Sequence, residues 1–520
     1  MEVSGKGMRL LKKGQSGLRL LFGRMGIALF LLIAQFLLMA AIFAWFEDYI
    51  IHYYGSALIV CIVMVLHLLN KQMEPTIRIA WIVVVMAAPV FGSLLYLFTL
   101  MNVGHRFLCR ATIRSIEDSK SNLAQDPQVL DTLKQRNSGA AGLCAFAVNK
   151  GDARIFRSTR TEYIPIGEIK LERMLQELEK AQKFIYMEYF IVSEGVMWGR
   201  ILEVLARKAR EGVDVRILYD GTCEFILLPK DYPRKLAKLG IQCKVFSPFK
   251  PFVSTHYNYR DHRKILVIDG KVAFNGGINL SDEYINVDAP FGHWKDTAVL
   301  LKGPAVRGFT RMFLQMWNMT EKTADHAGQE VIPEPEPAEG FVMPFADNPM
   351  DEVRMGHRVY SDILNRAEGS VDIMTPYLIL DAEMENTLRY AAARGVRVRL
   401  LLPGIADKYV PYAIAKTHYR TLLDAGVEIY EYTPGFVHGK MVVSDGREAV
   451  VGTINFDYRS FYHHFECGTY LYGTDCIDDI EKDFEHCLEM SRRVTAQSIR
   501  KEKWHRKLIG YLLKGFSPLL

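Results

Sequence analysis

The chain has 520 residues, which at roughly 100–200 residues per domain predicts three or four structural units. Its formal net charge is +5, and residues 1–24 alone carry six Lys or Arg against Glu2, so the remainder of the chain is balanced. A protein built mainly to bind nucleic acid spreads a basic surplus over its folded surface, and this distribution excludes that class.

The first hundred residues are far more apolar than the rest and predict membrane segments. Three runs without Asp, Glu, Lys or Arg, 25–46, 49–69 and 79–104, each reach the ~20 residues that a helix needs to cross a bilayer. We interpret 25–46 as a retained anchor, because its apolar core exceeds the ~7–15 residues of a signal peptide. The basic arm, 1–24, then lies in the cytoplasm.

The third run, 79–104, leaves the topology open. As a full span it would export everything after it, whereas the arginines that directly follow it favour the cytoplasmic side. Pro89 and Gly92 interrupt the run, which suits a re-entrant helix whose ends face the same side. The eight cysteines include no Cys-x-x-Cys pair and are typical of a reducing compartment. We therefore expect a multi-pass protein of the inner membrane with residues 105–520 in the cytoplasm.

After a connector, 105–149, the sequence contains the same unit twice. Residues 179–221 and 365–404 each have the pattern of a strand, a helix that ends at glycine and a second β-rich strand. This pattern is typical of a βαβ unit, and we expect it to lie in a largely parallel sheet.

The copies are separated by EVIPEPEPAEG at 330–340, whose prolines and glutamates are typical of a surface linker. We predict an α/β fold with two tandem domains related by a pseudo-twofold axis. They are residues 150–320 and 351–495, joined by a linker at 321–350.

Each copy carries one polar motif at matching offsets. Counting from His262 and from His438, lysine follows at +2, aspartate at +7, glycine at +14 and asparagine at +17. Residues two apart on a strand share a face, so each histidine and its lysine can address one ligand. A single H-x-K is a weak signal, but its duplication inside duplicated domains predicts one shared site. The motif residues are His262, Lys264, Asp269 and Asn279 in the first copy, and His438, Lys440, Asp445 and Asn455 in the second.

This set suits chemistry at phosphorus. One histidine can attack while the other protonates the departing oxygen, and the lysines with Asn279 and Asn455 can hold the anionic oxygens. Asp269 and Asp445 each precede a glycine in a predicted hairpin turn, so they either organise the turn or serve the site.

Other side chains near the motifs have less certain roles. A carboxylate behind each imidazole would fix its tautomer, and Asp296 and Glu466 are the candidates, with a surface ion pair as the alternative reading. The remaining histidines, including His293 and His464, we interpret as polar loop residues. No set of side chains at metal-ligand spacing accompanies the motifs, so we expect neither a metal nor a cofactor.

The two H-x-K-x4-D motifs with their trailing G-G/T-x-N resemble the phospholipase D superfamily over about residues 150–490. The apolar run at 76–98 before them is similar to the start of bacterial cardiolipin synthases, which usually begin with two membrane segments, so 25–46 is an addition. The resemblance implies phosphatidyl transfer between two phosphatidylglycerol molecules, giving cardiolipin and glycerol through a phosphohistidine, without metal or nucleotide.

The same resemblance implies that His262 is the nucleophile and His438 the acid and base, and the reverse assignment stays open. A lipid hydrolase of the same superfamily is the alternative function. The expected partners are phosphatidylglycerol and anionic membrane lipids. The tail at 498–520 combines six Lys or Arg with apolar residues near helical spacing, which predicts either a helix on anionic lipid or an ordinary packing helix.

Overall fold

The computed structural model of this chain describes residues 37, 50–100, 103–248, 259–321, 323–502, 504–515 and 517. It divides into two compact units, a small one within residues 11–103 and a large one within residues 104–517. The predicted arm at 1–24 and all of 25–46 except Leu37 lie outside the described residues.

The small unit contains three helices, α2 (Ile50–Asn70), α3 (Pro75–Ala87) and α4 (Pro89–Leu100). Their inner faces form a small core, and their outer faces expose many large apolar side chains. The run at 79–104 is not one helix, because Pro89 begins a new helix and Gly92 lets it approach the end of α3 closely. None of the described helices combines the length and the apolar character required to cross a membrane.

The large unit opens with α5 (Val103–Ser119), α6 (Pro127–Arg136) and α7 (Ser138–Lys150). Asp126 and Asn137 cap α6 and α7 by accepting backbone N–H bonds with their side chains. The sequence predicts only a connector here, yet the buried face of α7 belongs to the same core as strands more than 200 residues later.

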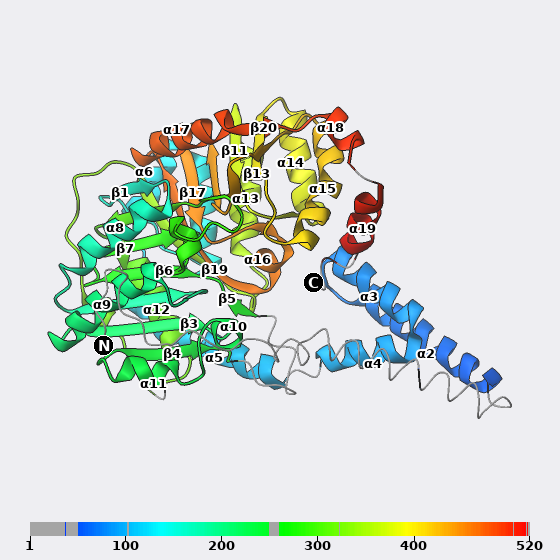
Figure 1. Ribbon diagram of the computed structural model, residues 1–520, viewed down its shortest axis with the longest axis horizontal. Helices are drawn as coiled ribbons and strands as arrows, with labels where there is room; N and C mark the ends of the chain where they lie inside the picture. The colour runs from blue at the N-terminus through cyan, green and yellow to red at the C-terminus, as the bar shows by residue number, and fades with distance from the viewer. Residues whose placement is uncertain are drawn as a thin grey trace. The chain divides into compact units, whose positions relative to one another are not determined.

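Two sheets follow (Figure 1), and the first seven strands of the second have the same order as the seven strands of the first. In the first half the order is β1-β9-β7-β6-β2-β3-β4, and in the second it is β10-β19-β17-β16-β11-β13-β14-β20. The predicted duplication therefore accounts for seven strands of each sheet, and β20 is an addition at the end of the second. The strands of the first sheet are β1 (Arg160–Ile164), β2 (Phe184–Tyr189), β3 (Asp214–Asp220), β4 (Gln242–Phe246), β6 (Lys264–Ile268), β7 (Val272–Gly276) and β9 (Ala298–Lys302). Those of the second are β10 (Phe341–Asp347), β11 (Ser370–Met374), β13 (Arg397–Pro403), β14 (Glu428–Tyr432), β16 (Met441–Ser444), β17 (Glu448–Gly452), β19 (His464–Tyr472) and β20 (Ser491–Arg493).

The expectation of a largely parallel sheet is wrong. Along these two strand orders, only β2-β3-β4 and β11-β13-β14 are parallel, and the other neighbours are antiparallel. The βαβ units account for the parallel part, while the hairpins β6-β7 and β16-β17 impose the antiparallel part. The predicted turns at Asp269-Gly270 and Asp445-Gly446 are confirmed, since all four residues have positive φ.

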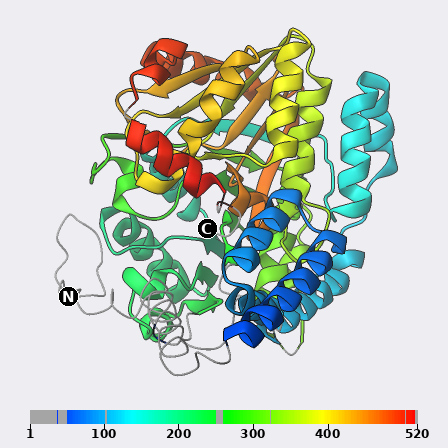
Figure 2. The same cartoon turned by 90° about the vertical axis from the view of Figure 1, so that its right-hand side faces the viewer.

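Helices cover both sheets and separate them. α12 (Val306–Asn318) is buried along its length and contacts β2, β6 and β7 of the first sheet and β10 of the second. α14 and α15 lie side by side against the second sheet (Figures 1 and 2). The remaining helices are α8 (Gly167–Leu178), α9 (Val196–Arg210), α10 (Cys223–Ile226), α11 (Tyr232–Ala237), α13 (Met355–Arg366), α14 (Ala382–Ala393), α15 (Tyr409–Asp424), α16 (Tyr458–Tyr462), α17 (Cys476–Glu489), α18 (Ala496–Arg500) and α19 (Trp504–Lys514).

The linker is shorter than the predicted 321–350. β10 occupies Phe341–Asp347 and pairs with β19 at the edge of the second sheet. Pro344 lies within this strand, and a proline is compatible with an edge strand because, among the described residues, the outer side of β10 is bridged only at Val342, to Phe156. The prolines at 330–340 led to a predicted linker that includes the residues of β10.

Candidate active site

Two short pairs of strands connect the first half, β1 to α12, to the second half, β10 to β20. In each pair, one strand comes from each half. β5 (Arg260–Asp261) runs parallel to the start of β19, and β15 (Gly435–Val437) runs parallel to β8 (His293–Lys295). Each pair joins the residues directly before one motif histidine to the residues directly before a candidate carboxylate of the other half. The two exchanges are related by the same pseudo-symmetry as the sheets.

The first centre joins His262 to Glu466. The backbone N–H of His262 donates to Phe465 O over 2.9 Å, and its Nδ1 lies 2.9 Å from Glu466 Oε2. The carboxylate is held further by the hydroxyls of Thr453 and Ser460, which donate to its two oxygens. Thr453 directly follows the +14 glycine of the second motif. Its hydroxyl orients Glu466, and Glu466 in turn orients His262.

The second centre joins His438 to Asp296. The backbone N–H of His438 donates to Lys295 O over 2.6 Å, and its Nδ1 lies 2.6 Å from Asp296 Oδ2. Gly277 stands at the position of Thr453, and a Cβ on it would lie 2.1 Å from Asp296 Oδ1. A glycine is therefore required where the shorter carboxylate approaches the backbone. Each imidazole consequently has its partner in the opposite half, a pairing that the sequence does not reveal.

Both motif lysines are fully buried beside their histidines. Lys264 Nζ donates to His262 O over 2.6 Å, and Lys440 Nζ donates to the carbonyl of His438. Burial lowers the pKa of Lys264 to about 8 and that of Lys440 to about 7. The charge of Asp296 opposes both shifts, so it acts on the lysines of both motifs and the two motifs converge on one region.

Burial also lowers the pKa values of both imidazoles. The pKa of His438 falls to about 4, with burial as the main cause and the charge of Lys440 as the next, and that of His262 falls well below its usual value. Burial alone would raise the pKa of Glu466, but the contacts with His262 hold it below its usual range. The arrangement is a neutral imidazole whose Nδ1–H donates to a carboxylate, which leaves Nε2 with a lone pair.

Asp269 and Asp445 lie at the far end of the hairpin strands from the histidines. The Asp269 carboxylate accepts backbone N–H bonds from Gln182, Lys183 and Phe184 at 2.7–2.9 Å, where β2 begins. Asp445 accepts the equivalent bonds at the start of β11. β6 and its turn separate Asp269 from Lys264 by five residues, on the order of 16 Å. These contacts favour turn organisation over a part in chemistry.

The two asparagines are buried beside the centres and already have protein partners. Asn279 accepts from Ile191 N and donates to Tyr284 Oη over 2.7 Å, and the Tyr284 ring makes a T-shaped contact with His438. Asn455 Nδ2 donates to Asp457 over 3.1 Å. In this arrangement the asparagines position neighbouring side chains.

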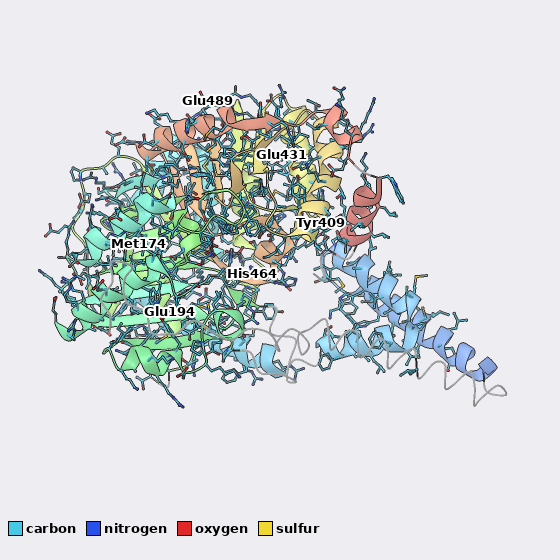
Figure 3. All side chains as sticks on the ribbon, in the orientation of Figure 1. Met174, Glu194, Tyr409, Glu431, His464 and Glu489 are labelled. Carbon is cyan, nitrogen blue, oxygen red and sulfur yellow. The ribbon has the colours of Figure 1, made fainter. Side chains whose placement is uncertain are left out.

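His464 is the residue near the site that the sequence interpretation missed. It lies in β19 (Figure 3) and is buried. Its ring centroid is 5.3 Å from that of His262. The expectation of a polar loop residue is therefore wrong for His464, and it is also wrong for His293, which lies in β8. The signal that was available is its place two residues before Glu466 in a β-rich run.

Comparison with known proteins agrees with this architecture. The model of the family described as cardiolipin synthase, PLD-like domain matches residues 174–317 and 360–488, one range in each half. A second model, described as the phospholipase D-nuclease N-terminal region, matches residues 58–99.

Relatives match most of the chain. A Streptococcus mutans protein without a functional name is 50% identical and covers 88% of this chain and 99% of its own length. The cardiolipin synthase of Alkalihalophilus pseudofirmus is 34% identical, with 86% and 90% covered, and that of Halalkalibacterium halodurans is 32% identical, with 96% and 99% covered.

A solved structure shares the fold. The phosphatidylserine synthase of Haemophilus influenzae superposes with a TM-score of 0.54 at 14% identity, over 69% of this chain and 93% of its own. The family match covers both halves, and the named relatives exceed 30% identity over most of the chain. This chain belongs to the cardiolipin synthase family of phospholipase-D-like proteins.

Proposed function

We propose that the protein is a phosphatidyltransferase that joins two phosphatidylglycerol molecules into cardiolipin and releases glycerol. The observation that carries the proposal is that each motif histidine contacts a carboxylate of the opposite half of the large unit. His262 contacts Glu466, and His438 contacts Asp296. Two oriented imidazoles supply a nucleophile and an acid–base group for a two-step transfer in one site.

In the first step Nε2 of His262 attacks the phosphorus of one phosphatidylglycerol. The bond between phosphorus and the head-group glycerol breaks, and His438 Nε2 gives a proton to the departing oxygen. Since burial leaves His438 neutral in the free protein, it acquires that proton when the anionic phosphodiester binds and raises its pKa. The products of this step are glycerol and a phosphatidyl-histidine.

In the second step a head-group hydroxyl of another phosphatidylglycerol attacks the phosphorus. His438 Nε2 takes the proton of that hydroxyl, the nitrogen–phosphorus bond to His262 breaks, and cardiolipin leaves. Lys264 and Lys440 balance the charge on the phosphoryl oxygens, and the amides of Asn279 and Asn455 hold the groups that surround them.

The test is product analysis with phosphatidylglycerol as the sole substrate. Cardiolipin and glycerol in equal amounts support the proposal. Phosphatidic acid as the main product would show that water replaces the second lipid, as in the hydrolase alternative.

We further propose that the small unit anchors the enzyme in the inner membrane. Most outward side chains of α2–α4, including Ile59, Leu66 and Met86, are apolar and exposed, as lipid-facing side chains are. The break at Pro89 suits a re-entrant hairpin that leaves 105–520 in the cytoplasm. Reporter fusions after Phe46, Asn70 and Arg114 test this topology, and an exterior signal after Arg114 would contradict it.

The tail contributes a second membrane contact in this proposal. α19 packs on α15 (Figures 1 and 2), where Gly510 approaches the backbone of Ala413. Trp504 and Leu512 of α19 are exposed. An aromatic and aliphatic face among basic residues fits anionic lipid. Changing Trp504 and Leu512 to Ser should lower sedimentation with phosphatidylglycerol vesicles, and equal sedimentation would contradict the contact.

A further inference from the structure

Three side chains of the first centre form a compact cluster of metal-ligand atoms. His262, His464 and Glu466 each offer one nitrogen or oxygen, and these atoms lie within 4.8 Å of one another. All three residues are buried, and His464 Nδ1 lies 3.4 Å from Glu466 Oε1 while His262 Nδ1 lies 2.9 Å from Oε2. Among the described residues, neither ring nitrogen of His464 makes a hydrogen bond of normal geometry.

These separations are close to those inside a zinc site. Zinc binds imidazole nitrogen and carboxylate oxygen at about 2.0–2.2 Å in tetrahedral geometry, which places neighbouring ligand atoms about 3.3 Å apart. Taken to one oxygen, Glu466 Oε1, the distances are 3.0 Å from His262 Nδ1 and 3.4 Å from His464 Nδ1, and these two distances bracket that value. Two histidines and one glutamate are a ligand set that zinc accepts with a fourth position open.

The surroundings hold the cluster in place. Thr453 and Ser460 donate to the two oxygens of Glu466, as groups behind a metal ligand do. The ring of Phe190 makes a T-shaped contact with that of His262, with 5.0 Å between centroids. The ligands therefore need little rearrangement to accept an ion.

Among the residues that the structure describes, the other centre has no third ligand. His262 bonds to the backbone of Phe465 and His438 to that of Lys295, so the residues one step earlier, His464 and Trp294, occupy equivalent positions. The ring of Trp294 lies 5.3 Å from that of His438, the same separation as between His464 and His262. An indole cannot ligate a metal, so the pseudo-symmetry is broken at this position.

We propose that His262, His464 and Glu466 bind a divalent transition-metal ion of the zinc class, and that the bound enzyme is inactive. The ion takes the Nδ1 lone pair of His262, and the ring proton moves from Nδ1 to Nε2. Nε2 then has no lone pair with which to attack phosphorus, and Glu466 binds the ion instead of the Nδ1 proton. The ion is an inhibitor in this scheme, and the inhibitory half rests on the proposed function.

Binding is measured directly on the untagged full-length chain in detergent, freed of metal with a chelator. Co²⁺ is titrated, and the visible absorption of tetrahedral Co²⁺ is followed and then displaced with Zn²⁺. We expect one ion per chain. Cardiolipin formation should fall roughly tenfold or more at saturation and return when the chelator removes the ion.

Variants locate the site. His464→Phe and His464→Asn should each weaken Co²⁺ binding roughly tenfold or more, and Zn²⁺ should no longer inhibit either variant relative to its own metal-free activity. The matched control is His486→Ala, which removes an exposed histidine on α17 and should bind Co²⁺ like the parent.

The outcomes separate this inference from the proposed function. A parent chain that binds no Co²⁺, or His464 variants that bind it as tightly as the parent, would overturn the metal site whatever the products of the reaction are. Binding that depends on His464 but leaves cardiolipin formation unchanged would overturn the inhibition and the role of His262 as nucleophile. Failure to form cardiolipin in metal-free enzyme counts against the proposed function alone.

Discussion

The side chains of the two centres divide into those that orient imidazoles and those that build the surrounding turns. Glu466 and Asp296 each contact the Nδ1 atom of a histidine from the opposite half, so Nε2 is the nitrogen left for chemistry. Neither half alone supplies both members of the His262–Glu466 pair or of the His438–Asp296 pair. Catalysis in this account therefore requires both halves folded together.

The orienting carboxylates give the first prediction. Glu466→Gln and Asp296→Asn should each lower kcat on the order of 10³-fold with little change in KM, because an amide can stabilise the wrong imidazole tautomer. Steady-state cardiolipin formation checks this. Activity within tenfold of the parent in either variant would mean that the contact does not matter for the reaction.

Asp269 gives the opposite prediction. Asp269→Asn replaces an oxygen that accepts the N–H of Gln182 or of Lys183 and Phe184, which should cost about 1–3 kcal/mol of unfolding free energy. Tm should fall, while the activity of the folded fraction stays near that of the parent. A loss of kcat at unchanged Tm would instead place Asp269 in the chemistry.

Lys440 sets an expected pH dependence. Its cationic form is needed to balance phosphoryl charge, and burial lowers its pKa to about 7. The charge is therefore present below that pH and lost above it, so kcat/KM should fall as pH rises from about 7 to 9. Lys440→Arg keeps its charge and should move the fall to higher pH, though at lower activity. A flat profile in the parent would contradict this role.

Short-range sequence patterns predict some of the strands and their pairing but not all of them. Matching offsets from His262 and His438 predicted both hairpins, because Asp-Gly turns and alternating strands are local signals. The pairing of β5 with β19 and of β15 with β8 was not predicted, since it joins residues about 140–200 positions apart in the chain. Local patterns were compatible with each carboxylate serving its own half.

The exchanged strands depend on a close approach at Gly435. A Cβ there would lie 2.3 Å from His293 O and 2.4 Å from His293 N, so Gly435→Ala should push β15 away from β8 and shift His438 from Asp296. We expect a loss of cardiolipin formation on the order of 10²-fold. Gly142→Ala on α7 meets no atom within 4 Å and should leave activity unchanged. Equal activity in the two variants would contradict the importance of this strand pair.

At the scale of the large unit, duplication explains the paired sheets but not how they are joined. The sequence predicted two domains with a connector and a linker. In the structure α7 packs into the core of the second half, and α12 is buried between the sheets. The sequence did not predict the packing of α7 or of α12, because the pattern of an amphipathic helix does not specify which distant surface the helix covers.

The central claim is that a phosphatidyl group passes through His262 in a site built by both halves. Mass spectrometry of the His438→Ala variant after incubation with phosphatidylglycerol tests it most directly, because loss of the acid–base group should slow release of the covalent intermediate. The account predicts a phosphatidyl adduct on His262 in His438→Ala and none in His262→Ala. An adduct on another residue, or one that persists in His262→Ala, would contradict it.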